Sequence, residues 1–271
     1  MSAALRTEYR KLVTTRMWWI LLASMAAYMA FLAGIMAFVM THPGGMTGST
    51  NTSGQVPRGA QDVARTVYTL ATSLGYVFPL IVGALAMTSE FRHQTITPTL
   101  LAEPRRTLVL AAKMISSVVV GLLFGLVGTL ATVATGAGVL ALLGKPTYLS
   151  DPIVLRSAAL SVLALTVWTI VGVGFGTLLT NQVAVIVVVL AFTQFVEPIL
   201  RLVLAQFDWS TGISKFLPGA AGEAITGASF YADSGMTAAL LPSWAGLLVL
   251  VGYALVFAAL GRVTSLERDI T

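Results

Sequence analysis

The sequence is poor in charged residues and contains no cysteine. Charged side chains make up 10% of the 271 residues and hydrophobic ones 56%, with a mean hydropathy of +0.87. Soluble domains carry about 25% charged residues, and a water-soluble fold of this length could not bury so much apolar surface. The composition therefore predicts a membrane protein. The absence of cysteine excludes disulfides and thiolate metal sites, and two histidines, His42 and His93, are too few for a histidine-rich metal site.

The sequence also lacks the motifs of nucleotide hydrolysis and of hydrolytic catalysis. It contains no Gly-x-x-x-x-Gly-Lys-[Ser/Thr] phosphate loop, no His-Glu-x-x-His and no serine-nucleophile motif. The glycines of 172–176 have the wrong spacing for a dinucleotide loop and lie in an apolar run, so they predict close helix packing, as do Gly121 and Gly125. We therefore expect no catalytic residue and no bound metal or cofactor in this chain. The net charge of +5 is expected to set membrane orientation, not to bind nucleic acid.

Apolar runs long enough to cross a bilayer, which takes about 20 residues, recur along the chain. We predict six spans at about 17–40, 67–87, 114–143, 153–179, 183–204 and 242–260. The expected fold class is an all-α polytopic membrane protein with one transmembrane domain over residues 1–271. Residues 2–16 are expected to form an amphipathic surface helix. Aromatic residues scattered among polar ones predict a re-entrant helical segment over 205–241, before the last span.

The basic residues are unequally divided between the two faces that six spans would create. Ten lie on the side of the termini and the 88–107 loop, and six lie on the other side. By the positive-inside rule, the N-terminus, the C-terminus and the 88–107 loop are therefore expected in the cytoplasm. The ten are Arg6, Arg10, Lys11, Arg16, Arg92, Arg105, Arg106, Lys113, Arg262 and Arg268; the six are Arg58, Arg65, Lys145, Arg156, Arg201 and Lys215.

Polar residues inside the predicted spans mark a candidate pathway, because charge within a bilayer is costly. Gln194, Glu197 and Arg201 are expected on one face of the fifth span, with Glu197 and Arg201 at the i,i+4 spacing of an ion pair. They could line a pathway, or they could be a snorkelling pair near the helix end. A second candidate face, in the second span, could line a transport path or could equally pack against a neighbouring helix. The expected pathway residues are Thr72, Tyr76, Phe192, Gln194, Phe195, Glu197 and Arg201.

The 88–107 loop carries more charge than a simple turn needs, and it contains a predicted short helix. Residues 95–103 predict about two helical turns, with Thr97 as the cap and Pro98 at the first helical position. Leu100 and Leu101 would then be exposed at a cytoplasmic tip, which is a contact surface if the chain belongs to a complex. The alternative is a helical loop lying on the membrane surface.

This loop resembles the first cytoplasmic loop of type-2 ABC-transporter permeases. The resemblance runs through Glu90-Phe-Arg-His-Gln-Thr-Ile, Thr99-Leu-Leu and Pro104-Arg-Arg, and it extends to the stretches 172–181 and 216–222. It covers essentially the whole chain, including the surface helix and the six spans. Two positions depart from the pattern: Gln94 stands where glycine is more frequent, and Pro98 is unexpected within the coupling segment.

The resemblance implies a permease of an exporter similar to the ABCG group, in the plasma membrane of a bacterium. Two permease subunits, usually a homodimer, would assemble in membrane lipid with two copies of an ATPase subunit, which binds the ATP and magnesium. The coupling role would fall to Glu90, Phe91, Arg92, Thr95, Ile96, Leu100, Leu101, Glu103, Arg105 and Arg106. The expected substrate is a hydrophobic or amphipathic drug, lipid or peptide.

Two other function classes compete with this interpretation. A secondary transporter commonly shows inverted repeats, and none is seen between residues 1–140 and 141–271. A membrane sensor or immunity protein would bind its ligand without moving it and would need no ATPase.

Overall fold

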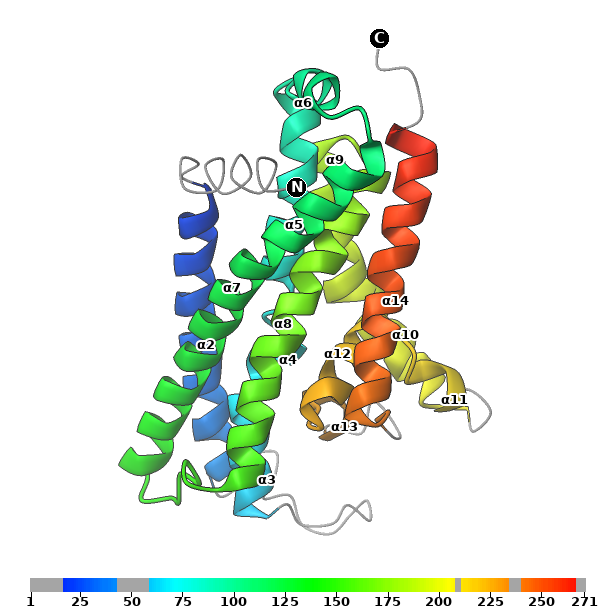
Figure 1. Ribbon diagram of the computed structural model, residues 1–271. Helices are drawn as coiled ribbons and strands as arrows, with labels where there is room; N and C mark the ends of the chain where they lie inside the picture. Colours follow the sequence, from blue (N-terminus) through cyan, green and yellow to red (C-terminus); the bar gives the residue numbers. More distant parts are fainter. Residues whose placement is uncertain (1–16, 43–58, 208–210, 234–239, 267–271) are drawn as a thin grey trace.

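The computed structural model describes residues 17–42, 59–207, 211–233 and 240–266, and within these residues the chain forms helices and no strand (Figure 1). Among these described residues, five helices are long and apolar enough to cross a membrane: Trp18–Thr41, Arg106–Leu142, Pro152–Leu178, Gln182–Leu204 and Ser243–Ser265. The described chain is therefore all-helical, as its composition predicts, and has the helices of a polytopic membrane protein. The predicted surface helix at 2–16 lies outside the described residues.

The bundle is built around α8 (Pro152–Leu178), which packs against α5, α7 and α14. In Figure 1, α2 (Met17–Thr41), α7 (Arg106–Leu142) and α14 (Ser243–Gly261) run along the length of the molecule beside it. The start of α8 follows from its sequence: Asp151 Oδ1 accepts hydrogen bonds from the backbone N–H groups of Ile153 and Val154, at 2.8 and 3.3 Å, and Pro152 occupies the first position.

The helix of the third predicted span begins earlier in the sequence than expected. Helix α7 has 37 residues and begins at Arg106, eight residues before the predicted start at Met114. The polar segment 106–113 therefore continues the apolar helix, because no proline or glycine interrupts it. As Figure 1 shows, α7 reaches from the end of the bundle that carries α6 (Ile96–Ala102) to the opposite end.

The second predicted span, at 67–87, is not a single helix. The chain forms α3 (Ala60–Tyr68), α4 (Leu70–Ser73) and α5 (Val77–Arg92) instead. Pro79 explains the second break: it has no N–H to donate to a preceding turn, so it is accommodated in the first turn of α5. At Gly75 a β-carbon would lie 2.8 Å from the backbone carbonyl oxygen of Ala71 and 2.6 Å from the sulfur of Met29, so the turn also needs a glycine.

The fifth predicted span contains a π-helical turn. It runs as α9 (Gln182–Ala191), the turn η1 (Phe192–Val196) and α10 (Glu197–Leu204). Pro198 accounts for the turn, because its ring would clash with the carbonyl of residue 194 in a regular α-helix. The extra residue in the turn rotates the following helix relative to α9. Gln194 is therefore exposed whereas Glu197 and Arg201 are buried, so the expectation that all three share one face is wrong for Gln194.

The described part of the segment before the last span contains three short helices. They are α11 (Thr211–Ser214), α12 (Pro218–Thr226) and α13 (Phe230–Asp233). Helix α12 is buried from Gly219 to Thr226 and packs against α4, α8 and α14. Figure 1 shows it within the half of the bundle that is remote from α6. A predominantly small-residue sequence allows this close packing.

Glycines bring α5, α7 and α8 together, as predicted. A β-carbon at Gly172 would clash with the carbonyl oxygen of Leu80 in α5, and one at Gly176 would lie 2.5 Å from that of Ala84. Gly121 of α7 meets the backbone of α8 in the same way. The glycine-rich runs thus serve close helix packing.

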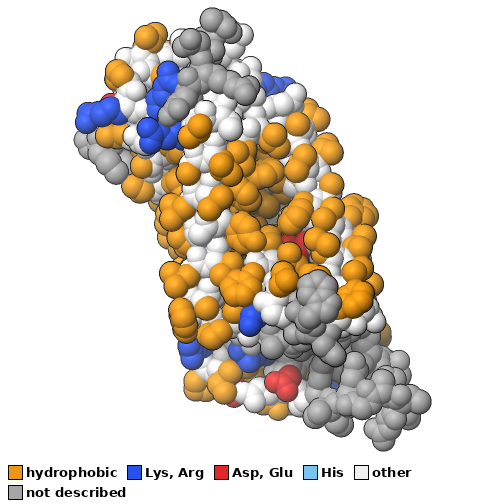
Figure 2. Space-filling view, turned by 90° about the vertical axis from the view of Figure 1, so that its right-hand side faces the viewer, with side chains coloured by type: hydrophobic (Ala, Val, Ile, Leu, Met, Phe, Trp, Pro, Cys, Tyr) orange, Lys and Arg blue, Asp and Glu red, His pale blue; other side chains and the backbone are white. Residues whose placement is uncertain are grey.

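The surface has the distribution of apolar and basic residues expected for a membrane protein. Figure 2 shows hydrophobic side chains across the middle of one face, with lysine and arginine toward both ends. Large hydrophobic residues of α2, α7, α9 and α14 are exposed along this length. In water such a surface would be a liability, whereas lipid or another subunit can cover it.

Candidate functional site

The predicted loop helix is present, but it begins earlier than the sequence suggested. Helix α6 spans Ile96–Ala102, with Thr95 at the N-cap position and no side-chain cap. Thr97 and Pro98 therefore lie in the first turn, and the prediction that Thr97 caps the helix is wrong. The physical reason lies just before the helix, where the chain leaves α5 in a tight turn that fixes the start of α6.

That turn is a Schellman motif centred on Gln94. The N–H of Thr95 donates to the carbonyl of Glu90 at 2.9 Å, and the N–H of Gln94 donates to the carbonyl of Phe91 at 3.2 Å. Gln94 has a φ of 53°, which is the left-handed conformation that normally selects glycine at this position. Gln94, where the sequence departs from the pattern that it resembles, thus has a strained backbone.

A small apolar cluster holds α6 against the end of α5. Met87 and Ile96 are buried, and Phe91 and Leu100 pack against them. Leu101 is 78% exposed. The expectation that both leucines form the exposed tip is therefore wrong for Leu100, because the helical rotation of about 100° between neighbours turns Leu100 inward. Leu101 alone of this pair is available for contact with a partner.

Polar contacts connect this end of α5 to two other helices. Lys113 Nζ of α7 lies 2.6 Å from Glu90 Oε1 and donates to the carbonyl of Ala86 at 3.0 Å, and the Glu90 and Lys113 side chains are both buried. Arg92 Nη1 donates to Oε1 of Gln182, the first residue of α9, at 2.9 Å. A displacement of the α5 end would therefore act on α7 and α9 directly.

The remaining charged residues of the loop lie near the start of α7. Arg105 Nε donates to Glu103 Oε1 at 3.0 Å, and this hydrogen bond holds the pKa of Glu103 below its ordinary value. Glu103 ends α6 and Arg105 precedes α7, so the pair spans the short connection between them. Arg106 is the half-buried first residue of α7. Because the pair is exposed, it contributes little to stability.

A second polar centre lies inside the bundle and ties α10 to α12. Glu197 Oε1 accepts from Arg201 Nη2 at 2.8 Å and Nε at 3.2 Å, which confirms the predicted ion pair. The same oxygen accepts from the backbone N–H groups of Gly219 and Ala220, at 2.7 and 3.2 Å. Leu217 at the N-cap of α12 cannot cap that helix, so Glu197 supplies the cap from another helix.

The guanidinium of Arg201 joins a second carboxylate from α12. Its Nη1 donates to Glu223 Oε2 at 2.8 Å, and Ser229 Oγ donates to the same oxygen. The Tyr231 ring lies 4.8 Å from the guanidinium carbon. The Glu197, Arg201 and Glu223 side chains are at most 2% exposed, so the alternative of a snorkelling pair does not hold. We call these three residues the ionic network.

The other end of α12 is held by a cation. Arg65 of α3 donates through Nη2 to the carbonyl of Thr226 at 3.1 Å and through Nε to Ser157 Oγ at 2.7 Å. Ser157 in turn donates to the same carbonyl at 2.9 Å. A carboxylate at the N-terminus and a guanidinium at the C-terminus match the dipole of the helix. Helix α12 is therefore clamped at both ends by distant elements.

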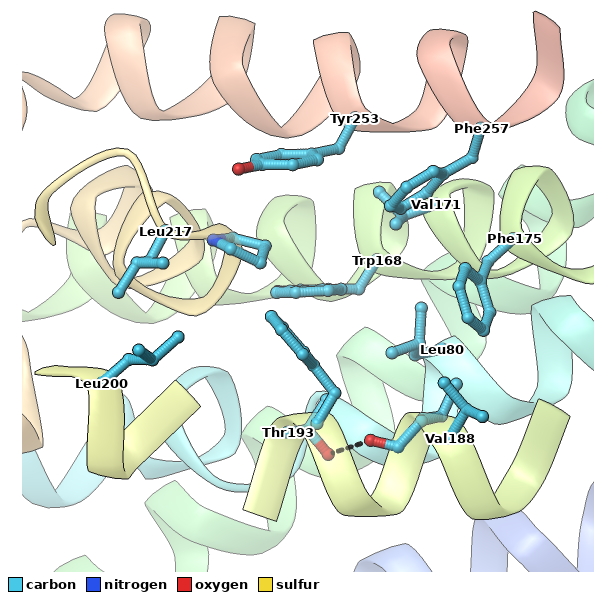
Figure 3. A pocket seen from close by; sticks show the side chains of 13 residues that line it. Leu80, Trp168, Val171, Phe175, Val188, Thr193, Leu200, Leu217, Tyr253 and Phe257 are labelled. Carbon is cyan, nitrogen blue, oxygen red and sulfur yellow. Dashed lines mark hydrogen bonds between the residues drawn. The ribbon is translucent and has the colours of Figure 1, made fainter. Parts of the chain in front are cut away.

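Beside this clamp lies a cavity of about 300 Å³ between α5, α8, α9, η1, α10, α14 and the start of α12. Figure 3 shows side chains from these helices pointing into it, and the hydrogen bond from Thr193 Oγ1 to the carbonyl of Val189 at 2.8 Å. Trp168 lies on its wall and stacks on Tyr76, with ring centroids 4.4 Å apart. The lining is aliphatic and aromatic except for Thr193 and the polar atoms of Trp168 and Tyr253.

The predicted pathway residues separate into four environments, and Glu197 and Arg201 occupy one of them, the ionic network. Phe192 lines the cavity, and the Tyr76 hydroxyl donates to the carbonyl of Thr193 at 3.4 Å. Thr72 is buried, and its hydroxyl has no hydrogen-bond partner among the described residues. Phe195 and Gln194 face outward. The structure thus brings only part of the predicted set together.

Sequence reasoning missed the partners of the charged residues. These are Lys113, Gln182, Glu223, Ser229 and Tyr231. Lys113 was counted only for membrane orientation, although a lysine that continues an apolar run could have suggested a buried partner. Glu223 carried a similar signal, as an acidic residue following the small-residue stretch 216–222. Their pairings join residues 22 to 23 positions apart on different helices, which no periodicity connects.

Comparison with known proteins gives no further assignment. No family model matches the chain, and no curated protein matches it. Functional conclusions must therefore come from the geometry described above.

Proposed function

We propose that this chain is the transmembrane permease subunit of an ATP-driven ABC exporter for a hydrophobic or amphipathic substrate. The observation that carries the proposal is the loop helix α6, which stands at one end of the bundle (Figure 1) and whose Leu101 side chain is exposed. An exposed leucine on a short helix outside the membrane is a liability in an isolated chain and a contact in a complex.

The internal contacts of this end suit a coupling role. Helix α6 packs on the end of α5 through Ile96, and the same end of α5 contacts α7 through Glu90 and α9 through Arg92. A force applied to α6 by a partner would therefore reach α5, α7 and α9. In the proposed mechanism, closure of a partner ATPase dimer pushes on α6 and switches the accessibility of the substrate cavity.

The proposed topology has six crossings, with the broken segment α3–α5 as the second. In Figure 1, α3 lies at one end of the bundle and the last turns of α5 lie at the other, so the three helices together extend along its length. The end that carries α6 would face the cytoplasm together with both termini, and α12 would form the re-entrant element of the opposite side. The membrane would be the plasma membrane of a bacterium.

The proposed assembly contains two permease chains and two ATPase subunits. The outer face of the fifth span supports a second chain, because Phe195 is 66% exposed and its neighbours along this face are also large and apolar. Lipid would cover the remaining apolar surface. ATP and magnesium would bind the ATPase subunits.

Co-purification with a matched pair of variants tests the proposal. The chain is purified in mild detergent from its native host, and ATP hydrolysis by the co-purifying complex is measured. We expect the unmodified chain and Leu142→Asp to retain an ATPase subunit, whereas Leu101→Asp loses it. Leu142 is a fair control because it is 88% exposed at the opposite end of the bundle. Both variants must elute as intact, monodisperse protein.

The proposal has clear contrary outcomes. Reproducible absence of an ATPase subunit from the unmodified chain would contradict it and would favour a secondary transporter or a sensor. Retention of the ATPase by Leu101→Asp, with unchanged substrate-stimulated hydrolysis after charge reversal at Glu90 and Arg92, would contradict the proposed role of α6.

A further inference from the structure

The cavity beside α12 has the lining of a ligand site. Its volume of about 300 Å³ is at the lower end of the range for small-molecule sites. Aromatic rings approach it from several helices: Trp168 and Phe175 from α8, Phe192 from η1, and Tyr253 and Phe257 from α14. Figure 3 shows Tyr253 and Phe257 on one side and Leu80 and Val188 on the other.

The walls of this cavity are fixed by interactions outside it. The π-helical turn places Phe192 and Thr193 on the lining and continues into α10, which contributes Leu200. The facing wall is Leu217 and Pro218, at the start of α12, where Glu197 holds the next two backbone N–H groups. Because the ionic network fixes α10 and α12 relative to one another, the cavity cannot close by a simple approach of these helices.

The lining of the cavity disfavours a charged ligand group. Among the residues that the structure describes, no Lys, Arg, Asp or Glu belongs to this lining. The guanidinium of Arg201, in the ionic network, already donates through Nε, Nη1 and Nη2 to Glu197 and Glu223. Burying a carboxylate or phosphate without a partner would cost several kcal/mol. Aromatic walls favour aromatic ligands instead, since offset and edge-to-face ring contacts add to apolar burial.

We infer that this cavity within a single chain binds a compact, uncharged aromatic compound. The volume and the rigid walls favour a small ring system over a long lipid chain or a peptide. The inference deepens the proposed transport function and rests on it for the fate of the ligand. Binding itself requires this chain alone, so it can fail or succeed independently of an ATPase partner.

Photolabelling with benzophenone tests the inference in the purified chain reconstituted in phosphatidylcholine nanodiscs. The matched charged probe is 4-benzoylbenzoate, which adds one carboxylate to the same ring system. Labelled peptides are located by mass spectrometry, and unlabelled naphthalene serves as the competitor. We expect benzophenone to label peptides containing Trp168, Phe192 or Phe257 in a saturable manner that naphthalene suppresses. Labelling by 4-benzoylbenzoate should be lower by about tenfold or more, the factor that corresponds to 1.4 kcal/mol.

Two adjacent substitutions provide the control within the chain. Val188 lines the cavity and is 43% exposed, whereas its neighbour Val187 is 58% exposed and does not line it. Filling the cavity by Val188→Trp should reduce saturable labelling by about tenfold or more, and Val187→Trp should leave it within about twofold. Equal labelling of both variants, or labelling that does not saturate, would overturn the inference.

An acyl chain is the competing occupant. A phosphatidylcholine that carries benzophenone at the end of one acyl chain is therefore reconstituted in a parallel sample. If it labels the same peptides and neither free benzophenone nor naphthalene displaces it, the cavity is a lipid site and the inference is wrong. Displacement by the free compounds supports it. A chain that binds benzophenone but lacks an ATPase partner would contradict only the proposed transport function.

Discussion

Replacing Arg201 with methionine removes the cation that both carboxylates of the ionic network contact. Methionine keeps a long apolar side chain but cannot donate a hydrogen bond. Three N–H groups of Arg201 are used at 2.8–3.2 Å, two by Glu197 and one by Glu223. The variant therefore leaves two carboxylates together in the interior, where each is 1% exposed.

The expected cost follows from the burial of this network. Removing one partner of a buried ion pair typically destabilises a protein by about 3–5 kcal/mol, because the remaining charge has lost its compensation. Arg201 also places Glu197 at the N-terminus of α12, where a cap contributes about 1 kcal/mol. These contributions are not additive, since they share one side chain. We expect Arg201→Met to lower the free energy of unfolding by about 4 kcal/mol.

A second substitution sharpens this prediction. Glu223→Gln alone should cost only about 1 kcal/mol, because the amide oxygen can still accept from Arg201 and Ser229 while Glu197 and Arg201 form a neutral pair. Added to Arg201→Met, the same substitution should restore stability, since it removes one of the two uncompensated carboxylates. The sign of its effect therefore reverses between the two backgrounds.

Unfolding by sodium dodecyl sulfate in mixed micelles, followed by far-ultraviolet circular dichroism, measures these free energies. The four proteins of the cycle are the unmodified chain, the two single variants and the double variant. The reasoning is refuted if Arg201→Met costs less than about 1 kcal/mol, the scale of an ordinary surface ion pair. It is also refuted if Glu223→Gln destabilises the Arg201→Met background further.

Three further predictions concern the rest of the bundle. Gln94→Gly should raise the free energy of unfolding by about 0.5–1 kcal/mol, because glycine adopts the left-handed conformation without strain. Slower hydrogen exchange at the end of α5 would show this stabilisation, and faster exchange would argue against the Schellman geometry. Gly172→Ala should lower the free energy of unfolding by more than about 2 kcal/mol, because its methyl group would contact the backbone of α5. At Gly138 a β-carbon meets nothing within 4 Å, so Gly138→Ala should be neutral or stabilising by up to about 1 kcal/mol. Detergent unfolding compares the two variants, and equal effects would contradict the packing described. Lys113→Met should lower the free energy of unfolding by about 3–5 kcal/mol, because it leaves Glu90 without this buried cation. Adding Glu90→Gln should recover part of the loss in the same assay. If it recovers none, the pair is unimportant for the fold.

The pattern of apolar runs predicted most of the long helices because hydrophobicity over about 20 residues is a local property. It did not predict the breaks at 69 and 74–76 or the π-helical turn. The break at 74–76 and the π-helical turn depend on how Pro79 and Pro198 fit against neighbouring helices, and a proline in an apolar run is compatible with a kink, a break or a widened turn. The position of Gln194 shows the consequence, because one added residue in the turn changed which face it occupies.

Local sequence by itself determined the helical class, the long apolar helices, the role of the glycine-rich runs in helix packing and the Glu197–Arg201 pair, since each depends on composition or on spacing within one helix. Only the tertiary structure decided which charges meet. Glu90 reaches Lys113, Arg201 also reaches Glu223, and the two ends of α12 are held by Glu197 and Arg65. Inside a largely apolar bundle an unpaired charge is costly, so each of these groups needed a partner, but spacing along the chain could not identify a partner that packing brings from another helix.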